Sequence, residues 1–321
     1  MPSDYLHLDV FTSRPFEGNQ LAVFPRPEGL TAAAMQAITQ EMNFSECTFI
    51  FPPEATGDVR MRIFTPHEEL PMAGHPTIGS TFALAAEGWI APGRQDFVFE
   101  LGVGPIPVSL EWRGDELFFV WMTQLLPIFG GTIGDRAALA SAAGLRDDDL
   151  FPDLPAQSVS CGIPYLVVPL TTRAAVDRVV IDRGALGRCF RDAGLEELPV
   201  FLFTTDAAGP TREPIARAVF ESVLADAAAN QTETVYSRML APGFGVAEDP
   251  ATGSASGPLG CYLHRHQVVS ADQARSMLSL QGVAMGRPSR IHISIDSRGG
   301  AITRVRVGGQ AVMVGKGVLN V

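Results

Sequence analysis

The chain has 321 residues, of which 46% are hydrophobic and 18% charged. This length suggests two domains, and the composition excludes the weakly hydrophobic, highly charged class of disordered proteins. The chain carries 24 Lys and Arg against 35 Asp and Glu, a formal net charge of −11, and an acidic surface disfavours nucleic acid as a partner.

Cysteine usage and the distribution of apolar residues narrow the class further. The four cysteines show no CxxC spacing, which disfavours a structural zinc site, and they are too few for a disulfide scaffold. The N-terminus has no signal-peptide pattern, and no apolar run reaches the roughly 18 residues that a membrane span requires. We therefore expect a cytoplasmic protein with reduced thiols and no membrane partner.

The first part of the chain is rich in predicted strands. Period-two alternation and β-branched or aromatic runs place them at 5–11, 21–24, 46–51, 59–64, 97–101, 106–112 and 117–122. A helix is expected at 31–42 with Thr31 as its N-cap. A second helix at 77–88 is apolar almost all round, which indicates a buried helix. The segment 122–131, with its proline and its Gly-Gly pair, is a candidate linker.

The second part mixes helices and strands. Helices are expected at 135–144, 213–228 and 253–264, and strands near 165–169, 199–204, 291–295, 302–307 and 310–314. The cationic run 264–266 is expected to end its helix. The acidic run 147–149 fits no EF-hand spacing, so a solvated loop is expected there rather than a calcium site. Without a strict βαβ alternation, the pattern favours an α+β architecture.

Two segments far apart in the chain match each other. His75-Pro-Thr-Ile-Gly-Ser-Thr and Asp249-Pro-Ala-Thr-Gly-Ser-Ala each lead into an apolar helix, and Arg62-Ile-Phe-Thr-Pro mirrors Arg238-Met-Leu-Ala-Pro upstream. The match predicts a duplication with His75 and Asp249 at equivalent positions. Helix starts carry unsatisfied N–H groups and the positive end of the helix dipole, so two of them facing each other would hold a substrate carboxylate.

Five motifs in order connect the chain to a known family. They are Asp9-Val-Phe with Phe16-Glu-Gly-Asn, Asn43-Phe-Ser-Glu, Phe64-Thr-Pro with Leu70-Pro-Met-Ala-Gly-His-Pro-Thr, Glu248-Asp-Pro-Ala-Thr-Gly-Ser-Ala, and Gln281-Gly with Gly286-Arg-Pro. With these motifs the chain resembles the PhzF-like proteins of phenazine biosynthesis, within the diaminopimelate epimerase fold group.

The resemblance implies an architecture. It implies two pseudo-symmetric halves, each a curved β-sheet wrapped around a central buried helix. Residues 1–125 form the first half, which strands from 308–321 would complete, and residues 126–307 form the second. The active site is expected in the cleft between the halves. The resemblance also implies a homodimer that needs neither an organic cofactor nor a metal.

The resemblance further implies an isomerase that moves a carbon-bound proton on a small carboxylate-bearing substrate. In the best-understood branch this substrate is a dihydro-hydroxyanthranilate. Glu46 maps to the general acid/base, with His75 and Asp249 as further catalytic groups. The expected substrate-binding residues are Asn19, Ser45, Gly74, Thr252, Gly253 and Ser254. Cys47 is expected on the opposite face of the strand from Glu46, and is therefore packed rather than catalytic.

Two other functions remain open. An amino-acid epimerase or racemase of the same fold would use a thiol at each helix start, but His75 and Asp249 stand there and Cys261 lies about two turns into its helix. A non-catalytic ligand-binding protein on this fold is the other alternative. Active-site thiol alkylation would support the first, and the absence of solvent exchange of carbon-bound protons would support the second.

Overall fold

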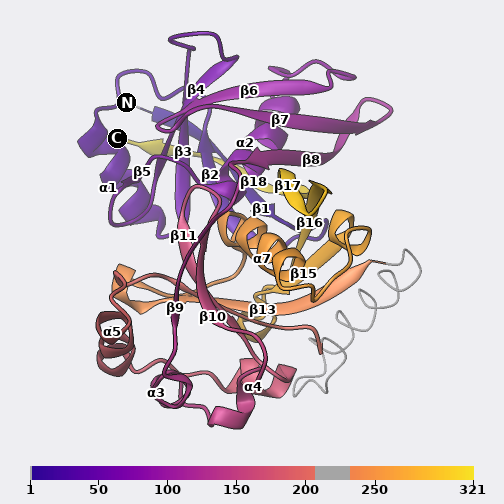
Figure 1. The fold of residues 1–321 in the computed structure, drawn as a ribbon. Helices are drawn as coiled ribbons and strands as arrows, with labels where there is room; N and C mark the ends of the chain where they lie inside the picture. Colours follow the sequence, from indigo (N-terminus) through magenta and orange to yellow (C-terminus); the bar gives the residue numbers. More distant parts are fainter. Residues whose placement is uncertain (1, 207–231) are drawn as a thin grey trace. The chain divides into compact units, whose positions relative to one another are not determined.

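A computed structural model of the protein describes residues 2–206 and 232–321. The helix expected at 213–228 lies outside these residues. The chain forms two compact units (Figure 1). The first consists of Met1–Gln124 and Arg306–Val321, and the second of Leu125–Val305. Both units mix helices with a predominant, curved sheet, so the α+β class predicted from the sequence is confirmed.

A sheet of mostly antiparallel strands forms the first unit. Its strands are β1 Pro2–Val10, β2 Asn19–Phe24, β3 Glu46–Phe51, β4 Val59–Phe64, β5 Glu69–Leu70, β6 Asp96–Leu101, β7 Gly104–Arg113, β8 Glu116–Gln124 and β18 Ala311–Asn320. They pair in the order β18-β1-β2-β3-β4-β6-β7-β8, with β5 added to β4. Only β2–β3 and β4–β6 are parallel among these pairs.

Helix α2 (Gly74–Ala86) is the central helix of the first unit. It contacts β1, β2, β3, β8 and β18, and Figure 1 shows it beside β8. Gly79 permits the close approach, because a Cβ there would lie 2.5 Å from the Leu21 side chain and 2.6 Å from that of Val10. Helix α1 (Ala32–Met42) contacts β3 and β4. Thr31 caps it as predicted, because its side chain accepts a hydrogen bond from the N–H of Ala34.

The second unit repeats this strand order. Its strands are β9 Ile128–Ile133, β10 Ala156–Ser160, β11 Pro164–Pro169, β12 Val200–Thr204, β13 Glu233–Ala241, β14 Val246–Asp249, β15 Met277–Gln281, β16 Ser289–Arg298 and most of β17 Ala301–Gly309. They pair in the order β9-β10-β11-β12-β13-β15-β16, with β14 added to β13. The parallel pairs, β11–β12 and β13–β15, occupy the same positions as in the first unit.

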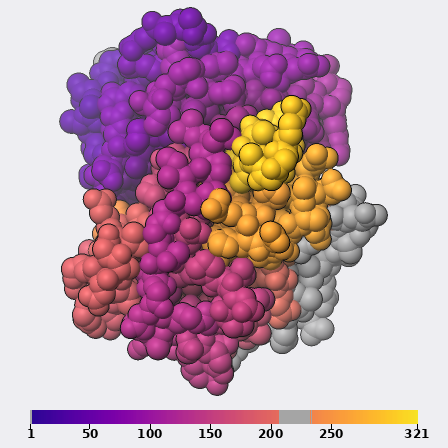
Figure 2. Space-filling model, viewed as in Figure 1, coloured from indigo at the N-terminus to yellow at the C-terminus, as the bar shows by residue number. Residues whose placement is uncertain are grey.

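Helix α7 (Gly253–Arg265) takes the central place in the second unit. It contacts β10, β11 and β16, and its buried residues join a hydrophobic cluster with these strands. The run 264–266 ends the helix as predicted, with His264 and Arg265 in the last turn. Three further helices, α3 Arg136–Ala142, α4 Arg173–Arg178 and α5 Arg183–Asp192, contribute to a separate cluster of buried apolar residues. In Figure 2 the turn between β16 and β17 lies at the surface, where residues 298–301 are exposed.

The linker predicted at 122–131 is shorter in the structure. Strand β8 continues to Gln124 and β9 begins at Ile128, so residues 125–127 alone lie between them. The Gly-Gly pair belongs to β9, where a Cβ at Gly131 would lie 2.8 Å from the Leu195 side chain. The pair therefore serves close packing rather than a flexible connection. Within the described ranges, no helix is long and apolar enough to cross a membrane.

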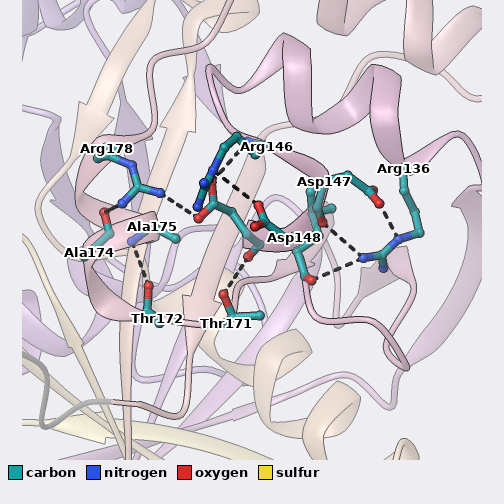
Figure 3. Close-up of polar contacts among 11 residues, drawn as sticks. Arg136, Arg146, Asp147, Asp148, Thr171, Thr172, Ala174, Ala175 and Arg178 are labelled. Atoms are coloured by element: carbon teal, nitrogen blue, oxygen red, sulfur yellow. Dashed lines mark hydrogen bonds and ion pairs between the residues drawn. The ribbon is translucent and has the colours of Figure 1, made fainter.

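The acidic run at 147–149 is solvated only in part: Asp147 and Asp148 are exposed, as expected from the sequence, but Asp149 is not. It forms a 3-10 turn in which Asp149 is buried. The Asp149 carboxylate accepts hydrogen bonds from the Arg178 guanidinium (2.6 Å) and from the backbone N–H of Arg146 (3.0 Å). In Figure 3, Arg146 lies between Arg178 on the left and the labelled Asp147 and Asp148 on the right. Burial alone would raise the pKa of Asp149, but these donors outweigh it and lower that pKa.

Candidate active site

The first cluster of predicted site residues lies within the first unit. Glu46 is the first residue of β3, and His75 is the second residue of α2. Oε2 of Glu46 lies 3.4 Å from Nε2 of His75. On the other side of the ring, Nδ1 lies 3.3 Å from the side-chain nitrogen of Asn19, at the start of β2. Three elements thus bring these predicted residues together.

Burial decides the charge of the histidine. The His75 side chain is 4% exposed, and this desolvation lowers its pKa to about 3, although a hydrogen bond with the Gln20 backbone opposes the shift. The ring is therefore neutral at neutral pH, so its contact with Glu46 is not an ion pair. Nδ1 faces Asn19 and Nε2 faces Glu46, and the tautomer decides which of the two ring nitrogens donates.

The neighbour of Glu46 in the sequence is packed, as predicted. Cys47 is fully buried in a hydrophobic cluster that contains Phe24, Phe49 and Phe64, and burial raises the pKa of its thiol to about 12. Strand alternation places Glu46 on the other face. The strand therefore presents a carboxyl group on one side and an inert thiol on the other.

The second cluster lies within the second unit. Asp249 ends β14 and is buried. Its Oδ2 accepts a 2.5 Å hydrogen bond from the hydroxyl of Thr252, the N-cap residue of α7. The fully buried Gln281, at the end of β15, donates to the backbone carbonyl of Asp249 (2.8 Å) and to the Thr252 hydroxyl (2.9 Å). These residues form one hydrogen-bonded network.

The remaining predicted residues lie beside these two clusters. Ser254, the second residue of α7, makes a 2.7 Å hydrogen bond with the Tyr165 hydroxyl rather than with Asp249. Gly74 and Gly253 are the first residues of α2 and α7 and are buried. Ser45 directly precedes β3 and is half-buried. Each predicted residue therefore lies at a helix start, at a strand end or directly beside one.

The duplication is real, but its register differs from the one that the sequence suggested. Gly74 and Gly253 begin the two helices, so His75 corresponds to Ser254. Ile63 pairs with Leu70 just as Met239 pairs with Asp249, so Asp249 corresponds to Leu70. The prediction that His75 and Asp249 are equivalent is therefore wrong. The Pro-x-x-Gly-Ser match in the sequence is therefore shifted by five residues from the correspondence that the structure shows.

Three pairs of contacts support the structural register. Arg62 forms a two-pronged ion pair with Glu69, and Arg238 forms one with Glu248. The Thr77 hydroxyl donates to the N-cap carbonyl of α2 at 2.8 Å, and the Ser256 hydroxyl donates to that of α7 at 2.9 Å. A Cβ at Gly102 would lie within 3.2 Å of Pro71, and one at Gly282 within 3.1 Å of Pro250.

Two site residues were missed in the sequence. Gln281 belongs to one of the five motifs, but nothing in its neighbourhood indicates that it reaches β14 and α7. Tyr165 lies in a predicted strand whose pattern reads as core. A buried amide or phenol needs a hydrogen-bond partner, so a glutamine or tyrosine within an apolar strand is the one available signal. It does not identify which partner the residue meets.

The family described as phenazine biosynthesis-like proteins (PhzC-PhzF) matches residues 8–317. A trans-2,3-dihydro-3-hydroxyanthranilate isomerase of Pseudomonas chlororaphis is 33% identical, over 98% of this chain and 98% of its own length. An uncharacterized isomerase of Mesorhizobium japonicum is 34% identical, with 98% of each chain covered.

Solved structures agree with this family. A phenazine biosynthesis protein of the PhzF family from Bacillus anthracis is similar over the full length of both chains, with a TM-score of 0.81 and 23% identity. A predicted epimerase from Pseudomonas aeruginosa has a TM-score of 0.77 and 30% identity over 99% of each chain. A hydroxyproline epimerase from Agrobacterium vitis shares the fold, with a TM-score of 0.60 and 11% identity over 99% of this chain and 92% of its own.

Proposed function

Because this chain belongs to the PhzC-PhzF family of phenazine biosynthesis-like proteins, and is an isomerase of that family, we propose that it moves a carbon-bound proton with Glu46 as general acid and base. The substrate is a small carboxylate-bearing molecule, and neither an organic cofactor nor a metal takes part. The relatives that act on trans-2,3-dihydro-3-hydroxyanthranilate favour a cyclic substrate of that kind.

The observation that carries this proposal is the contact between Glu46 and a neutral His75. A base that takes a proton from carbon must also return one, and a single carboxyl group can do both. In the proposed reaction, Glu46 takes the proton from one carbon of the substrate. The electron pair of the broken C–H bond moves into the conjugated system, and Glu46 returns the proton to another carbon. Neutral His75 holds the carboxyl group without pairing it as an ion.

The helix starts supply the binding groups in this proposal. The N-cap residues Ala73 of α2 and Thr252 of α7 both make no side-chain capping hydrogen bond. Backbone N–H groups at a helix start attract anions, so we assign the substrate carboxylate to such a start. Asn19, Ser45, Gly74, Gly253 and Ser254 are the further proposed binding residues.

We also propose that both clusters act on one substrate, that Asp249 is the third catalytic group, and that the protein works as a cytoplasmic homodimer. His75→Ala and Asp249→Ala should each slow turnover while the protein stays folded. Unfolding of either variant would assign that residue a purely structural role. Near-equal losses in the two single variants and in the double variant would support one shared step, because groups that act as a unit are not additive.

Isotope exchange tests the reaction itself. The protein is incubated in D2O with trans-2,3-dihydro-3-hydroxyanthranilate and with a panel of cyclic and amino-acid carboxylates, and deuterium incorporation is followed by NMR. The proposal expects deuterium at carbon in at least one cyclic carboxylate, together with a shifted double bond. Exchange confined to the α-carbon of an amino acid would instead assign the chain to the epimerases. No exchange across the panel would contradict an isomerase with this substrate class.

A further inference from the structure

Gln281 is a fully buried side chain at the end of β15. Its amide orientation is determined by its partners. The backbone N–H of Thr252 donates to Oε1 (3.1 Å), so the oxygen must lie on that side. Nε2 then faces the Asp249 carbonyl and the Thr252 hydroxyl, at 2.8 and 2.9 Å. The opposite amide orientation would place two donors, and also two acceptors, against each other.

The orientation of the amide sets the direction of the next hydrogen bond. The Thr252 hydroxyl accepts a hydrogen bond from Nε2–H of Gln281, so its own O–H points to Oδ2 of Asp249, 2.5 Å away. Hydrogen bonds arranged in such a chain polarise and strengthen one another. The network therefore fixes one carboxylate oxygen of Asp249 as an acceptor and restrains the rotation of its side chain.

This arrangement is at odds with helix stability. Thr252 is the N-cap residue of α7, where a threonine hydroxyl would normally accept a hydrogen bond from an N–H of the first turn. Here it makes no such bond, so the helix lacks the stabilisation that an N-cap hydroxyl normally provides. The hydroxyl bonds to Asp249 instead.

The first unit shows that the fold forms without this network. In the structural register, Leu70, Ala73 and Leu101 occupy the positions of Asp249, Thr252 and Gln281. None of the three carries a polar side chain, yet β4, β5 and α2 adopt the same arrangement as β13, β14 and α7. A structural need of the strand-to-helix connection therefore does not explain the network.

The geometry points to Gln281 and Thr252 as positioning residues that hold the Asp249 carboxylate in its reactive orientation. This inference rests on the proposed function, in which Asp249 acts on the substrate. It also changes the role of Thr252, which the sequence placed among the substrate-binding residues. A positioning role lowers kcat and leaves KM nearly unchanged, whereas a direct contact with bound substrate raises KM.

Three substitutions test the inference. Thr252→Val is nearly isosteric and removes only the hydroxyl. Thr252→Ser keeps the hydroxyl and serves as the matched control. Gln281→Glu keeps the acceptor for the Thr252 N–H but replaces the amide donor with an oxygen, so the Thr252 hydroxyl turns toward Glu and away from Asp249. Thermal unfolding is measured for each variant, to separate loss of position from loss of fold.

We expect Thr252→Val and Gln281→Glu to lower kcat by roughly 10- to 100-fold, as a misplaced reacting group does, with KM within about threefold of wild type. Thr252→Ser should stay within about threefold in both constants. The inference is overturned if Thr252→Val leaves kcat unchanged, or if it raises KM at constant kcat. If Gln281→Glu unfolds, the comparison of Thr252→Val with Thr252→Ser still tests the inference.

A second measurement does not depend on turnover. A hydroxyl proton held in a short, buried hydrogen bond exchanges slowly with solvent, so NMR should detect the Thr252 hydroxyl proton close to the side-chain amide protons of Gln281. Absence of that proton contact in the wild-type protein would overturn the inference, whatever the substrate is. The proposed function can fail separately. If Glu46→Gln incorporates deuterium at the substrate carbon as fast as the wild type does, the proposed function is wrong, but the hydrogen-bonded network of Asp249, Thr252 and Gln281 is unaffected.

Discussion

Oε2 of Glu46 lies 3.4 Å from Nε2 of His75, and burial keeps that histidine neutral. The two residues come from a strand and a helix that the sheet of the first unit brings together. A neutral imidazole beside a carboxyl group can donate one hydrogen bond or accept one, depending on its tautomer. It therefore supports the carboxyl group in both protonation states, which an arginine or lysine could not do.

The buried histidine makes stability depend on pH. The pKa of His75 is about 3 in the folded protein and about 6.5 when it is exposed. Between these values the unfolded chain binds more protons than the folded one, so the free energy of unfolding falls as the pH falls from 6.5 toward 3. From pH 7 to pH 5, His75 should contribute a loss of about 2 kcal/mol.

Urea unfolding of the wild type and His75→Gln at both pH values measures this contribution. The variant should lose less stability on acidification, and the difference should be about 2 kcal/mol. His67→Gln is the matched control, because His67 is exposed, and it should track the wild type. His292, whose pKa burial lowers to about 4, adds an acid-dependent loss common to all three proteins. Equal pH dependence in His75→Gln and wild type would contradict a buried neutral His75.

The two Arg–Glu pairs should differ in their contribution to stability. Arg238 and Glu248 are 11% and 15% exposed, and Arg238 also donates to three carbonyl groups at the end of α4. Arg62 and Glu69 are 24% and 41% exposed. Breaking a buried pair costs about 3–5 kcal/mol, whereas an exposed pair contributes about 1 kcal/mol or less.

Arg238→Ala should therefore lower the free energy of unfolding by about 3 kcal/mol, and Arg62→Ala by about 1 kcal/mol. Chemical denaturation of both variants under one set of conditions gives the comparison. Equal losses in the free energy of unfolding would contradict the expectation that the more buried Arg238–Glu248 pair contributes more than the Arg62–Glu69 pair.

Two glycines of one turn provide a matched test of close packing. Gly282 and Gly286 have positive φ angles of 72° and 70°. A Cβ at Gly282 would lie 2.5 Å from the Pro250 carbonyl oxygen, whereas at Gly286 it would meet nothing within 4 Å. The left-handed conformation alone costs a side chain about 1–2 kcal/mol.

Gly286→Ala should thus destabilise the protein by about 1 kcal/mol, and Gly282→Ala by clearly more, because the backbone around Pro250 must shift. Pro250 directly follows Asp249, so Gly282→Ala should also lower turnover. Thermal unfolding and the exchange assay measure the two effects. Equal Tm values for the two variants would contradict the close contact with Pro250.

The thiols offer a test against the racemase alternative. All four cysteines are buried, and burial raises the pKa of the Cys47 thiol to about 12. A thiol reagent at pH 8 should therefore leave proton exchange unchanged for as long as the protein stays folded, and all four thiols should react in denaturant. Rapid inactivation of the native protein, with protection by substrate, would support thiol catalysis instead.

The local elements of the first unit could be read from the sequence. Alternation places Glu46 and Cys47 on opposite faces, and Thr31 caps its helix, because both effects involve only near neighbours in the chain. Strand β5 consists only of Glu69 and Leu70, so it is too short to show the alternation of apolar and polar residues that predicts a strand. Asp149 reads as solvated because its partner Arg178 is far away in the sequence.

The site could be predicted only in part, for a related reason. Glu46, His75 and Asp249 stand in recognisable motifs, but the correspondence between the two units is set by backbone contacts. The approach of Gly102 to Pro71, and of Gly282 to Pro250, fixes the register. The sequence match instead aligned Gly79-Ser80 with Gly253-Ser254. Gln281 contacts Asp249 and Thr252 only because β15 pairs with β13 in the folded unit.

Glu46→Gln tests the central claim most directly. With a substrate that the wild type converts in D2O, NMR follows deuterium incorporation, and calorimetry measures substrate binding. Loss of the acid/base group should reduce exchange by roughly 10²- to 10⁴-fold, while Kd changes by no more than about threefold. Glu41→Gln, a change at an exposed site on α1, should exchange like the wild type. Full exchange by Glu46→Gln would contradict the assignment of Glu46 as the group that moves the proton.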